Sequence, residues 1–252
     1  MLDIERLTKI YPNGTVALKE VTLSVPDGQF LAVVGLSGSG KSTLLRCINR
    51  LVEPTSGRIM LDGVDVTAAG PNELRRIRMK IGMIFQQFNL VDRASVLTNV
   101  LAGRLGYVSP WWSLLHRFRG SDFQAAHATL DRVGIREKAL QRADSLSGGQ
   151  QQRVGIARAL AQEPKLILAD EPVASLDPAT AHSVLKYLEE INREDGITVI
   201  CNIHFLSLAR RYAHRAVALK AGELVFDGKP EEIDQARFRE VYGEEAVEVE
   251  IG

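Results

Sequence analysis

The chain has 252 residues, of which 45% are hydrophobic and 25% are charged, so a sizeable core is expected and disorder as the main state is excluded. Its 31 basic and 31 acidic residues give a formal net charge of zero, which argues against a protein that lives on nucleic acid. No apolar run approaches the length that crosses a bilayer, and the N-terminal residues, with Asp3 and Glu5 among them, do not form a secretory signal.

Short strands are predicted over the first third of the chain. Apolar and polar residues alternate over 2–11 and 16–25, with a turn at Asn13–Gly14 between them. A fully apolar run, 30–34, predicts a buried strand that ends at Gly35. Further strands are predicted near 56–66 and within 81–88.

The middle of the chain, 91–161, has the apolar spacing of helices. Asp122 is predicted as the N-cap of one of them, and Gly134 as its stop. Beyond this block, strands are predicted at 165–170 and 196–204, a helix opened by Pro178 lies between them, and 215–230 closes as a hairpin.

Strands that alternate with helices predict an α/β fold with a mostly parallel sheet. We expect one domain over 1–252, in which 1–88 and 162–252 form the core and about 89–161 form an inserted helical subdomain. The segment 231–250 carries eight acids against Arg237 and Arg239, and we interpret it as a solvated acidic surface.

The most specific local motif is GLSGSGKST, residues 35–43, between the predicted buried strand and a helix. Glycines allow the loop backbone to aim N–H groups at one anion, and the helix N-terminus adds its positive end. Lys41 would reach the β- and γ-phosphates of a nucleotide, and the Ser42 hydroxyl would bind Mg²⁺. The phosphate-binding residues predicted here are Gly35, Ser37, Gly38, Ser39, Gly40, Lys41, Ser42 and Thr43.

The segment LILADEP, residues 166–172, is an apolar strand that ends in two acids, where a carboxylate would sit beside the phosphate loop. Asp170 is predicted to hold Mg²⁺ directly or through water, and Glu171 to act as general base on the attacking water. Gln86, after the strand in 81–88, would reach Mg²⁺ or that water without adding charge. His204, at the end of the strand in 196–204, would contact the γ-phosphate and sense its loss.

The segment LSGGQ, residues 146–150, followed by QQRVGIARAL, resembles the signature of ATP-binding-cassette ATPases. Ser147 and the amides of Gly148 and Gly149 precede a helix start, which makes a second anion site. The resemblance implies the nucleotide-hydrolase core of that family, with an antiparallel β-subdomain. It also implies a head-to-tail dimer in which ATP lies between Lys41 of one chain and Ser147 of the other.

The resemblance covers essentially the whole chain and assigns further residues. Tyr11 matches the aromatic residue that stacks on adenine, and Gln86 the glutamine that couples to the transport partner. His204 matches the switch histidine. The signature residues assigned in this way are Leu146, Ser147, Gly148, Gly149 and Gln150, and those of the loop that crosses the dimer interface are Ser175, Leu176 and Asp177.

A narrower resemblance is to the ATPase subunits of phosphonate importers, carried by 88–118, LADEPVASLDP and the segment that begins ITVICNIHF. It implies ATP and Mg²⁺ as cofactors, membrane permease subunits as partners on the cytoplasmic face, and an external solute-binding protein acting indirectly. Carbon–phosphorus-cleaving enzymes are a further conceivable partner. Phe205 replaces the glutamine expected after the switch histidine, and Ala94 replaces a bulky aliphatic residue, which leaves the transported solute open.

Alternatives remain at this point. The chain could energise import of another small solute or associate with phosphonate-degrading enzymes. A soluble cassette acting on DNA or ribosomes is disfavoured, since no heptad run or basic excess is present. An exporter is disfavoured because exporters often fuse the cassette to a membrane domain. The aromatic stretch 108–118 either docks the permease or packs inside the helical subdomain.

Overall fold

The computed structural model describes residues 1–108, 118–174 and 176–243. The strands are β1 (Leu2–Ile10), β2 (Val16–Val25), β3 (Phe30–Val34), β4 (Ser56–Leu61), β5 (Val64–Asp65), β6 (Ile81–Ile84), β7 (Leu166–Ala169), β8 (Thr198–Asn202), β9 (Arg215–Lys220) and β10 (Glu223–Gly228). The α-helices are α1 (Lys41–Ile48), α2 (Pro71–Met79), α3 (Val96–Leu101), α5 (Gly120–Arg132), α6 (Gly148–Leu160), α7 (Pro178–Asp195), α8 (Leu206–Tyr212) and α9 (Gln235–Tyr242). Short 3₁₀ turns are η1 (Ala102–Gly106), η2 (Arg136–Lys138), η3 (Ala143–Ser145) and η4 (Pro230–Glu232).

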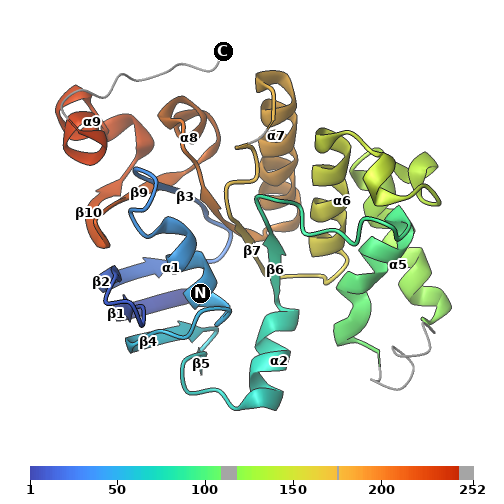
Figure 1. The fold of residues 1–252 in the computed structure, drawn as a ribbon, viewed down its shortest axis with the longest axis horizontal. Coiled ribbons are helices and arrows are strands. Elements are labelled where there is room, and N and C mark those ends of the chain that lie inside the picture. The colour runs from blue at the N-terminus through green and yellow to red at the C-terminus, as the bar shows by residue number, and fades with distance from the viewer. Residues whose placement is uncertain (109–117, 175, 244–252) are drawn as a thin grey trace.

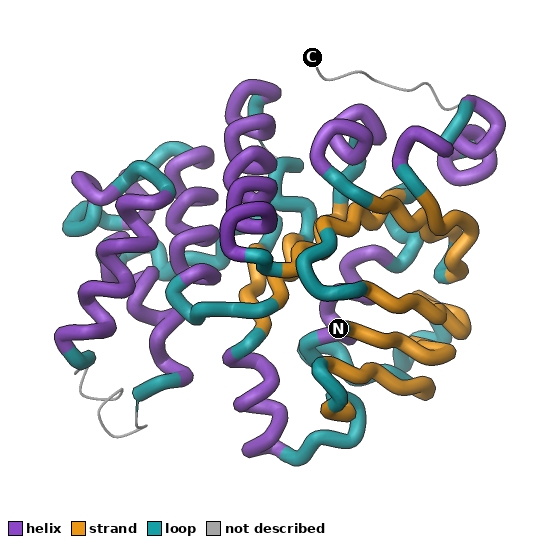
Figure 2. The backbone as a smooth tube through the Cα atoms, turned by 180° about the vertical axis from the view of Figure 1, so that it is seen from behind, coloured by secondary structure: helices purple, strands orange, loops and turns teal. Residues whose placement is uncertain are grey.

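Two sheets form one side of the molecule, and α3, α5 and α6 form the other (Figure 1). One sheet is antiparallel, in the order β2-β1-β4-β5. The other has the order β10-β9-β3-β8-β7-β6, and all its pairs except β9–β10 are parallel. Seen from behind, the strands again gather on one side, and the other side consists of helices and the loops that join them (Figure 2). The predicted α/β fold with a mostly parallel sheet is confirmed.

The buried strand β3 separates two apolar cores. Phe30, Ala32 and Val34 lie in a core that also contains residues of α5, α6 and α7. Leu31 and Val33 lie in a second core with residues of α1, β1 and β2. Because successive side chains of a strand point to opposite faces, this one five-residue strand joins the helical side to the antiparallel sheet.

The helical side differs in one detail from the sequence-based expectation. Asp122 is not the N-cap of α5; Arg119 is, and the Asp122 carboxylate accepts a hydrogen bond from the Arg119 backbone N–H at 3.0 Å. The same carboxylate is buried and accepts from Nε of Arg104 at 3.0 Å. The stop at Gly134 is confirmed, since α5 ends at Arg132 and Gly134 adopts a left-handed φ of 70°.

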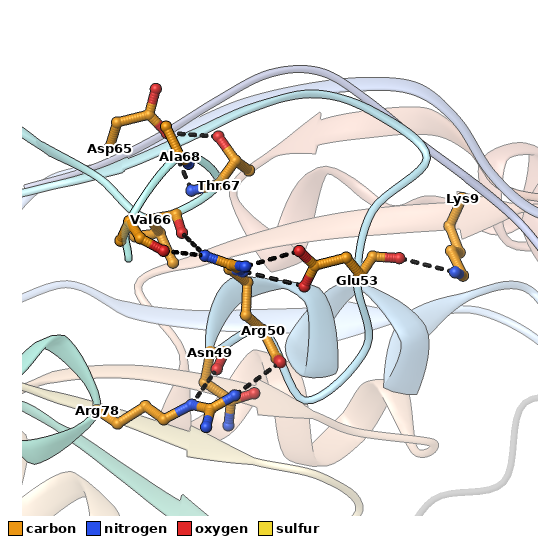
Figure 3. Close-up of polar contacts among 10 residues, drawn as sticks. Lys9, Asn49, Arg50, Glu53, Asp65, Val66, Thr67, Ala68 and Arg78 are labelled. Atoms are coloured by element: carbon orange, nitrogen blue, oxygen red, sulfur yellow. Dashed lines mark hydrogen bonds and ion pairs between the residues drawn. The ribbon is translucent and has the colours of Figure 1, made fainter. Parts of the chain in front are cut away.

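The C-terminal end of α1 is fixed by two arginines (Figure 3). The Arg50 guanidinium donates to both carboxylate oxygens of Glu53 and to the carbonyls of Val66 and Ala69. Arg78, on α2, donates to the carbonyls of Asn49 and Arg50 at 2.9 and 2.8 Å. The helix that begins at the phosphate loop is therefore tied at its far end to α2 and to the loop after β5.

The sequence analysis missed α2, α8 and α9. Within 231–250, residues 235–242 form α9, and its Phe238 and Val241 are buried in the apolar core. The acids at 231, 232, 234 and 240 are exposed, so the predicted solvated acidic surface is confirmed for them. The apolar side of α9 was not predicted, and residues 244–252 lie outside the described part of the chain. Among the described residues, none of the helices combines the length and apolar character that a membrane span requires.

Candidate nucleotide-binding site

Two glycines shape the loop between β3 and α1. Any other residue at these positions would force the neighbouring backbone to move. At Gly35, with φ 137°, a Cβ would lie 2.2 Å from the Leu219 carbonyl oxygen. At Gly40, with φ 109°, it would lie 2.4 Å from the Ala17 carbonyl oxygen. Both distances are shorter than any contact a Cβ makes, so the loop closes against the two sheets only with glycine at these positions.

Lys41 is buried, with 3% of its surface exposed, although it carries an ammonium group. Its Nζ donates to the carbonyls of Gly35 and Leu36 at 2.8 and 2.9 Å. Burial lowers the pKa of Lys41, and the nearby carboxylates of Glu171 and Asp170 oppose that shift. The Ser39 hydroxyl is also buried and has no hydrogen-bond partner among the described residues. A cation and a free donor inside one loop fit a phosphate.

A cleft of about 240 Å³ opens beside this loop. The Tyr11 hydroxyl, at one side, lies 3.3 Å from Oγ1 of Thr43. The structure thus brings Tyr11, residues of the phosphate loop and Glu171 into one cleft. The lining residues are Tyr11, Thr15, Val16, Ala17, Gly38, Gly40, Lys41, Ser42, Thr43 and Glu171, of which the sequence analysis missed residues 15–17.

Asp170 follows β7 directly and is 2% exposed. Its Oδ1 accepts from Oγ of Ser42 at 2.6 Å and from Nδ2 of Asn202 at 2.8 Å, and its Oδ2 accepts from Nη2 of Arg46 at 3.1 Å. Sequence reasoning missed Arg46 and Asn202. A polar residue at the end of the apolar strand TVIC is the pattern that could have identified Asn202.

The pair Ser42–Asp170 fits Mg²⁺, because both groups offer the oxygen ligands that this ion prefers. The described residues contain no cluster of three or more His, Cys, Asp or Glu side chains that could hold a metal. A magnesium ion here would therefore depend on nucleotide phosphates for part of its coordination, which is usual for this ion in nucleotide sites.

Glu171 and His204 meet at the edge of the cleft. Nε2 of His204 lies 2.7 Å from Oε1 of Glu171, and the Glu171 side chain is 14% exposed. Glu171 has a left-handed φ of 52°, which is unfavourable for a residue with a Cβ. A strained backbone that aims a carboxylate into a cleft is a frequent feature of functional sites.

Gln86 is held less firmly than the other predicted site residues. It lies in the turn after β6, and its side chain is exposed. The Asp170 amide donates to the carbonyl of Ile84 at 2.9 Å, so this turn begins close to the carboxylate pair. In the described part of the chain, the Gln86 side chain makes no hydrogen bond with Ser42 or Asp170.

The signature segment begins α6. The Ser147 Oγ accepts from the Gln150 N–H at 3.4 Å, and the Gln150 side chain accepts from the Ser147 N–H at 3.2 Å, a reciprocal cap. Ser147 and Gly148 are exposed, while Leu146 is buried. The start of α6 does not line the cleft beside α1, and α7 lies between the two helices (Figure 1). One chain therefore does not bring Ser147 to its own Lys41.

The loop predicted to cross the dimer interface precedes α7. Asp177 caps this helix by accepting from the N–H and the hydroxyl of Thr180 at 3.0 and 2.6 Å. Leu176 packs against the apolar core, and Ser175 lies outside the described residues. Phe205, which departs from the expected pattern, also packs against that core.

The stretch 108–118 is only partly described. Val108 is buried, and Phe118 makes an edge contact with Phe123 at 6.3 Å between ring centroids. Its two tryptophans, its leucines 114 and 115 and the rest of 109–117 lie outside the described residues. The two ends of the stretch thus pack internally.

Comparison with known proteins places this geometry in a family. The model of the family described as "ABC transporter" matches residues 18–174. The chain is 59% identical over 250 residues to a phosphonates import ATP-binding protein PhnC of Bdellovibrio bacteriovorus, covering 99% of this chain and 96% of that protein. It is 52% identical over 243 residues to PhnC 3 of Halalkalibacterium halodurans, covering 96% and 94%.

Solved structures agree with the sequence relatives. The dimeric post-hydrolysis state of the ATP-binding cassette MJ0796 bound to ADP and Pi has a TM-score of 0.81 and 37% identity, covering 91% of this chain and 99% of that one. The cassette cbiO1 of Clostridium perfringens has a TM-score of 0.81 and 30% identity, covering 95% and 92%. The chain therefore belongs to the ABC transporter family, as one of its ATP-binding-cassette ATPases.

Proposed function

We propose that this chain is the ATP-hydrolysing subunit of a membrane importer that takes up phosphonates or a related small phosphorus oxyanion. The cleft that joins Tyr11, the phosphate loop and Glu171 supports ATP hydrolysis. Full-length similarity to proteins named as phosphonates import ATP-binding proteins, at 51–59% identity, supports the class of solute. The chain itself acts on ATP, and the permease selects the solute.

In the proposed mechanism each residue of the cleft has a separate task. Lys41 and the loop amides bind the β- and γ-phosphates, and Tyr11 stacks on the adenine. Glu171 holds the attacking water and accepts its proton. His204, paired with Glu171 at 2.7 Å, orients that carboxylate toward the γ-phosphate.

Ser42 and Asp170 would hold Mg²⁺, with Gln86 as a further ligand or as a contact to the attacking water. When bound, the ion neutralises charge on the transferred phosphoryl group. The 2.6 Å hydrogen bond from Ser42 to Asp170 places both oxygen donors together before the nucleotide arrives. The protein thus supplies a preorganised pair of ligands.

The second half of each ATP site would come from another copy of the chain. Ser147 is exposed at the N-terminus of the 13-residue helix α6, and an exposed helix N-terminus favours an anion. A head-to-tail dimer would place it on the γ-phosphate bound by the partner's phosphate loop, with residues 175–177 at the interface. Loss of the γ-phosphate would then remove contacts made only in the closed dimer.

A separate groove of about 510 Å³ lies between α2 and η1 and fits the permease. It is lined by Arg75, Arg78, Met79, Gly103, Leu105 and Gly106 among others, and 41% of the Leu105 surface is exposed. We propose that a short permease helix binds there on the cytoplasmic face of the membrane, and that residues 89–161 transmit its movement as one helical subdomain. An external solute-binding protein would act on the permease, not on this chain.

The test is uptake of labelled methylphosphonate by cells that lack the chain and carry variants of it. Wild-type protein should restore uptake, whereas Lys41→Ala and Glu171→Gln should not. Lys41→Ala should also weaken ATP binding by about 10- to 100-fold, because a charge-assisted contact to phosphate is lost. Glu171→Gln should bind ATP, hydrolyse it very slowly and accumulate as a dimer.

Phosphate uptake by the same cells is the control and should be unchanged. If deletion of the chain left methylphosphonate uptake intact, the phosphonate assignment would be wrong, while the ATPase assignment would stand. If Glu171→Gln kept wild-type turnover, the general base would be a different residue.

A further inference from the structure

Asn202 is an unusual residue for its position. It ends β8, a strand whose five residues are all buried, and it is itself 0% exposed. β8 pairs in parallel with β3 on one side and β7 on the other, with Asn202 opposite Val33 and Cys201 opposite Ala169. This register places Asn202 between the start of the phosphate loop and Asp170.

Within the described part of the chain, the side chain of Asn202 makes a single hydrogen bond, and that bond is to the acid predicted to hold Mg²⁺. Nδ2 of Asn202 donates to Oδ1 of Asp170 at 2.8 Å, the oxygen that also accepts from Ser42. Arg46 donates to the other carboxylate oxygen, Oδ2. The carboxylate is therefore held from three directions, and Asn202 contributes the only fully buried side chain of the three donors.

The other end of the amide is unpaired. Oδ1 of Asn202 is buried and has no hydrogen-bond partner among the described residues. Buried polar groups are nearly always satisfied, so an orphaned acceptor beside a cation site calls for an explanation. An amide with an unpaired oxygen is costly at this buried position, and its hydrogen bond to Asp170 is the role that accounts for it.

We propose that Asn202 is a positioning residue for the magnesium site: its Nδ2 fixes the Asp170 carboxylate in the orientation that the nucleotide-bound ion requires. It does not touch the nucleotide. The inference rests on the proposed role of Asp170 as a magnesium ligand. Outer-shell partners of this kind typically change metal affinity by about 10- to 100-fold when they are removed.

A matched control is available within the same chain. Asn192, on α7, is also a buried asparagine, with 4% of its surface exposed. Its Nδ2 donates to the carbonyls of Gly28 and Ile197, at the opposite ends of the neighbouring strands β3 and β8. Substitution there removes a buried amide of equal size without touching Asp170.

The experiment titrates Mn²⁺ into the full chain saturated with ADP and follows free Mn²⁺ by its electron paramagnetic resonance signal. ADP keeps hydrolysis out of the measurement. The variants are Asn202→Ala, Asn202→Leu, Asn192→Ala and Asn192→Leu. ADP affinity in EDTA and the thermal midpoint are measured on the same samples.

Both Asn202 variants should weaken Mn²⁺ binding by about tenfold and change metal-free ADP affinity less than twofold. The Asn192 variants should lower the thermal midpoint without changing Mn²⁺ affinity. Equal Mn²⁺ affinity in wild type and both Asn202 variants would overturn the proposal, whatever happens to the thermal midpoint. Failure of the wild-type chain to bind ADP at all would instead refute the proposed nucleotide site.

Discussion

Two residues of the cleft, Glu171 and Lys41, are held in arrangements that are unfavourable by themselves. Glu171 holds its carboxylate 2.7 Å from His204 with a backbone φ of 52°. Lys41 is 3% exposed and has its pKa lowered by burial. Neither arrangement favours the stability of the nucleotide-free chain, and both direct a functional group toward the cleft.

Because the backbone of Glu171 has a left-handed φ, we expect the glycine variant at this position to be more stable than the alanine variant. Within a helix the order is the reverse. Glu171→Ala and Glu171→Gly both remove the carboxylate and its contact with His204. Alanine must keep the left-handed φ, whereas glycine adopts it freely, so the glycine variant should be more stable by about 1 kcal/mol.

Urea unfolding of both variants measures this difference. The same pair at Glu189, a residue inside α7, is the control, and there alanine should be the more stable by about 1 kcal/mol. If Glu171→Ala were instead more stable than Glu171→Gly, residue 171 would not keep its left-handed φ in solution.

At the scale of elements, the packing of α6 against α7 depends on one glycine. A Cβ at Gly149 would lie 2.7 Å from Cγ2 of Thr180, near the start of α7. Thr180 cannot simply turn away, because its hydroxyl donates to Asp177 at 2.6 Å. The second signature glycine thus sets the distance between the signature helix and the helix that follows the proposed interface loop.

Gly149→Ala should therefore destabilise the chain by about 1 to 3 kcal/mol, despite the higher helix propensity of alanine. Adding Thr180→Ser should recover most of that loss, because serine lacks the clashing methyl group and keeps the hydroxyl. Denaturant unfolding of the single and double variants measures the coupling.

Gly148→Ala is the control at the neighbouring position. A Cβ there would have its nearest neighbours, Leu176 and Phe88, at 3.8 Å, so stability should change little. Equal losses at 148 and 149, or no recovery with Thr180→Ser, would contradict the packing argument.

For the whole molecule, the order of the parallel strands gathers the predicted site residues at one edge of the sheet. The phosphate loop follows β3, His204 follows β8, Asp170 and Glu171 follow β7, and Gln86 follows β6. The carboxyl ends of neighbouring parallel strands meet, so residues far apart in sequence converge there. The signature segment lies outside this edge, which makes the proposed site incomplete within one chain.

Mixing two inactive variants tests the two-chain site. A Lys41→Ala chain and a Ser147→Ala chain should each hydrolyse ATP poorly. In a mixed head-to-tail dimer one site combines the intact Lys41 with the intact Ser147, so an equimolar mixture should recover up to about a quarter of wild-type activity. Steady-state phosphate release measures the recovery.

The double variant Lys41→Ala, Ser147→Ala mixed with either single variant leaves no intact site and is the control. If the equimolar mixture had only the mean activity of the two single variants, each chain would hydrolyse ATP without residues from a second copy. The Ser147→Ala chain should also keep its ADP affinity, because Ser147 does not line its own cleft.

The local motifs were predictable from the sequence because backbone geometry within a few residues defines them. The glycines of 35–40 adopt positive φ values that residues with a Cβ rarely adopt, and Ser147 caps the helix it begins. The strands and most long helices also follow from local apolar spacing. These features require little knowledge of what lies elsewhere in the chain.

Only the tertiary structure decided which side chains from distant segments meet. Asn202 and Arg46 are 32 and 124 residues from Asp170, and no local pattern links them to it. Asp122 lies near the start of a helix, where an aspartate often serves as the N-cap. Here its carboxylate instead accepts a hydrogen bond from the buried Arg104, and Arg119 is the N-cap. Acidic residues surround α9 in the sequence, so local composition did not indicate that Phe238 and Val241 pack against the apolar core. These contacts depend on how distant segments pack together, which the whole fold determines.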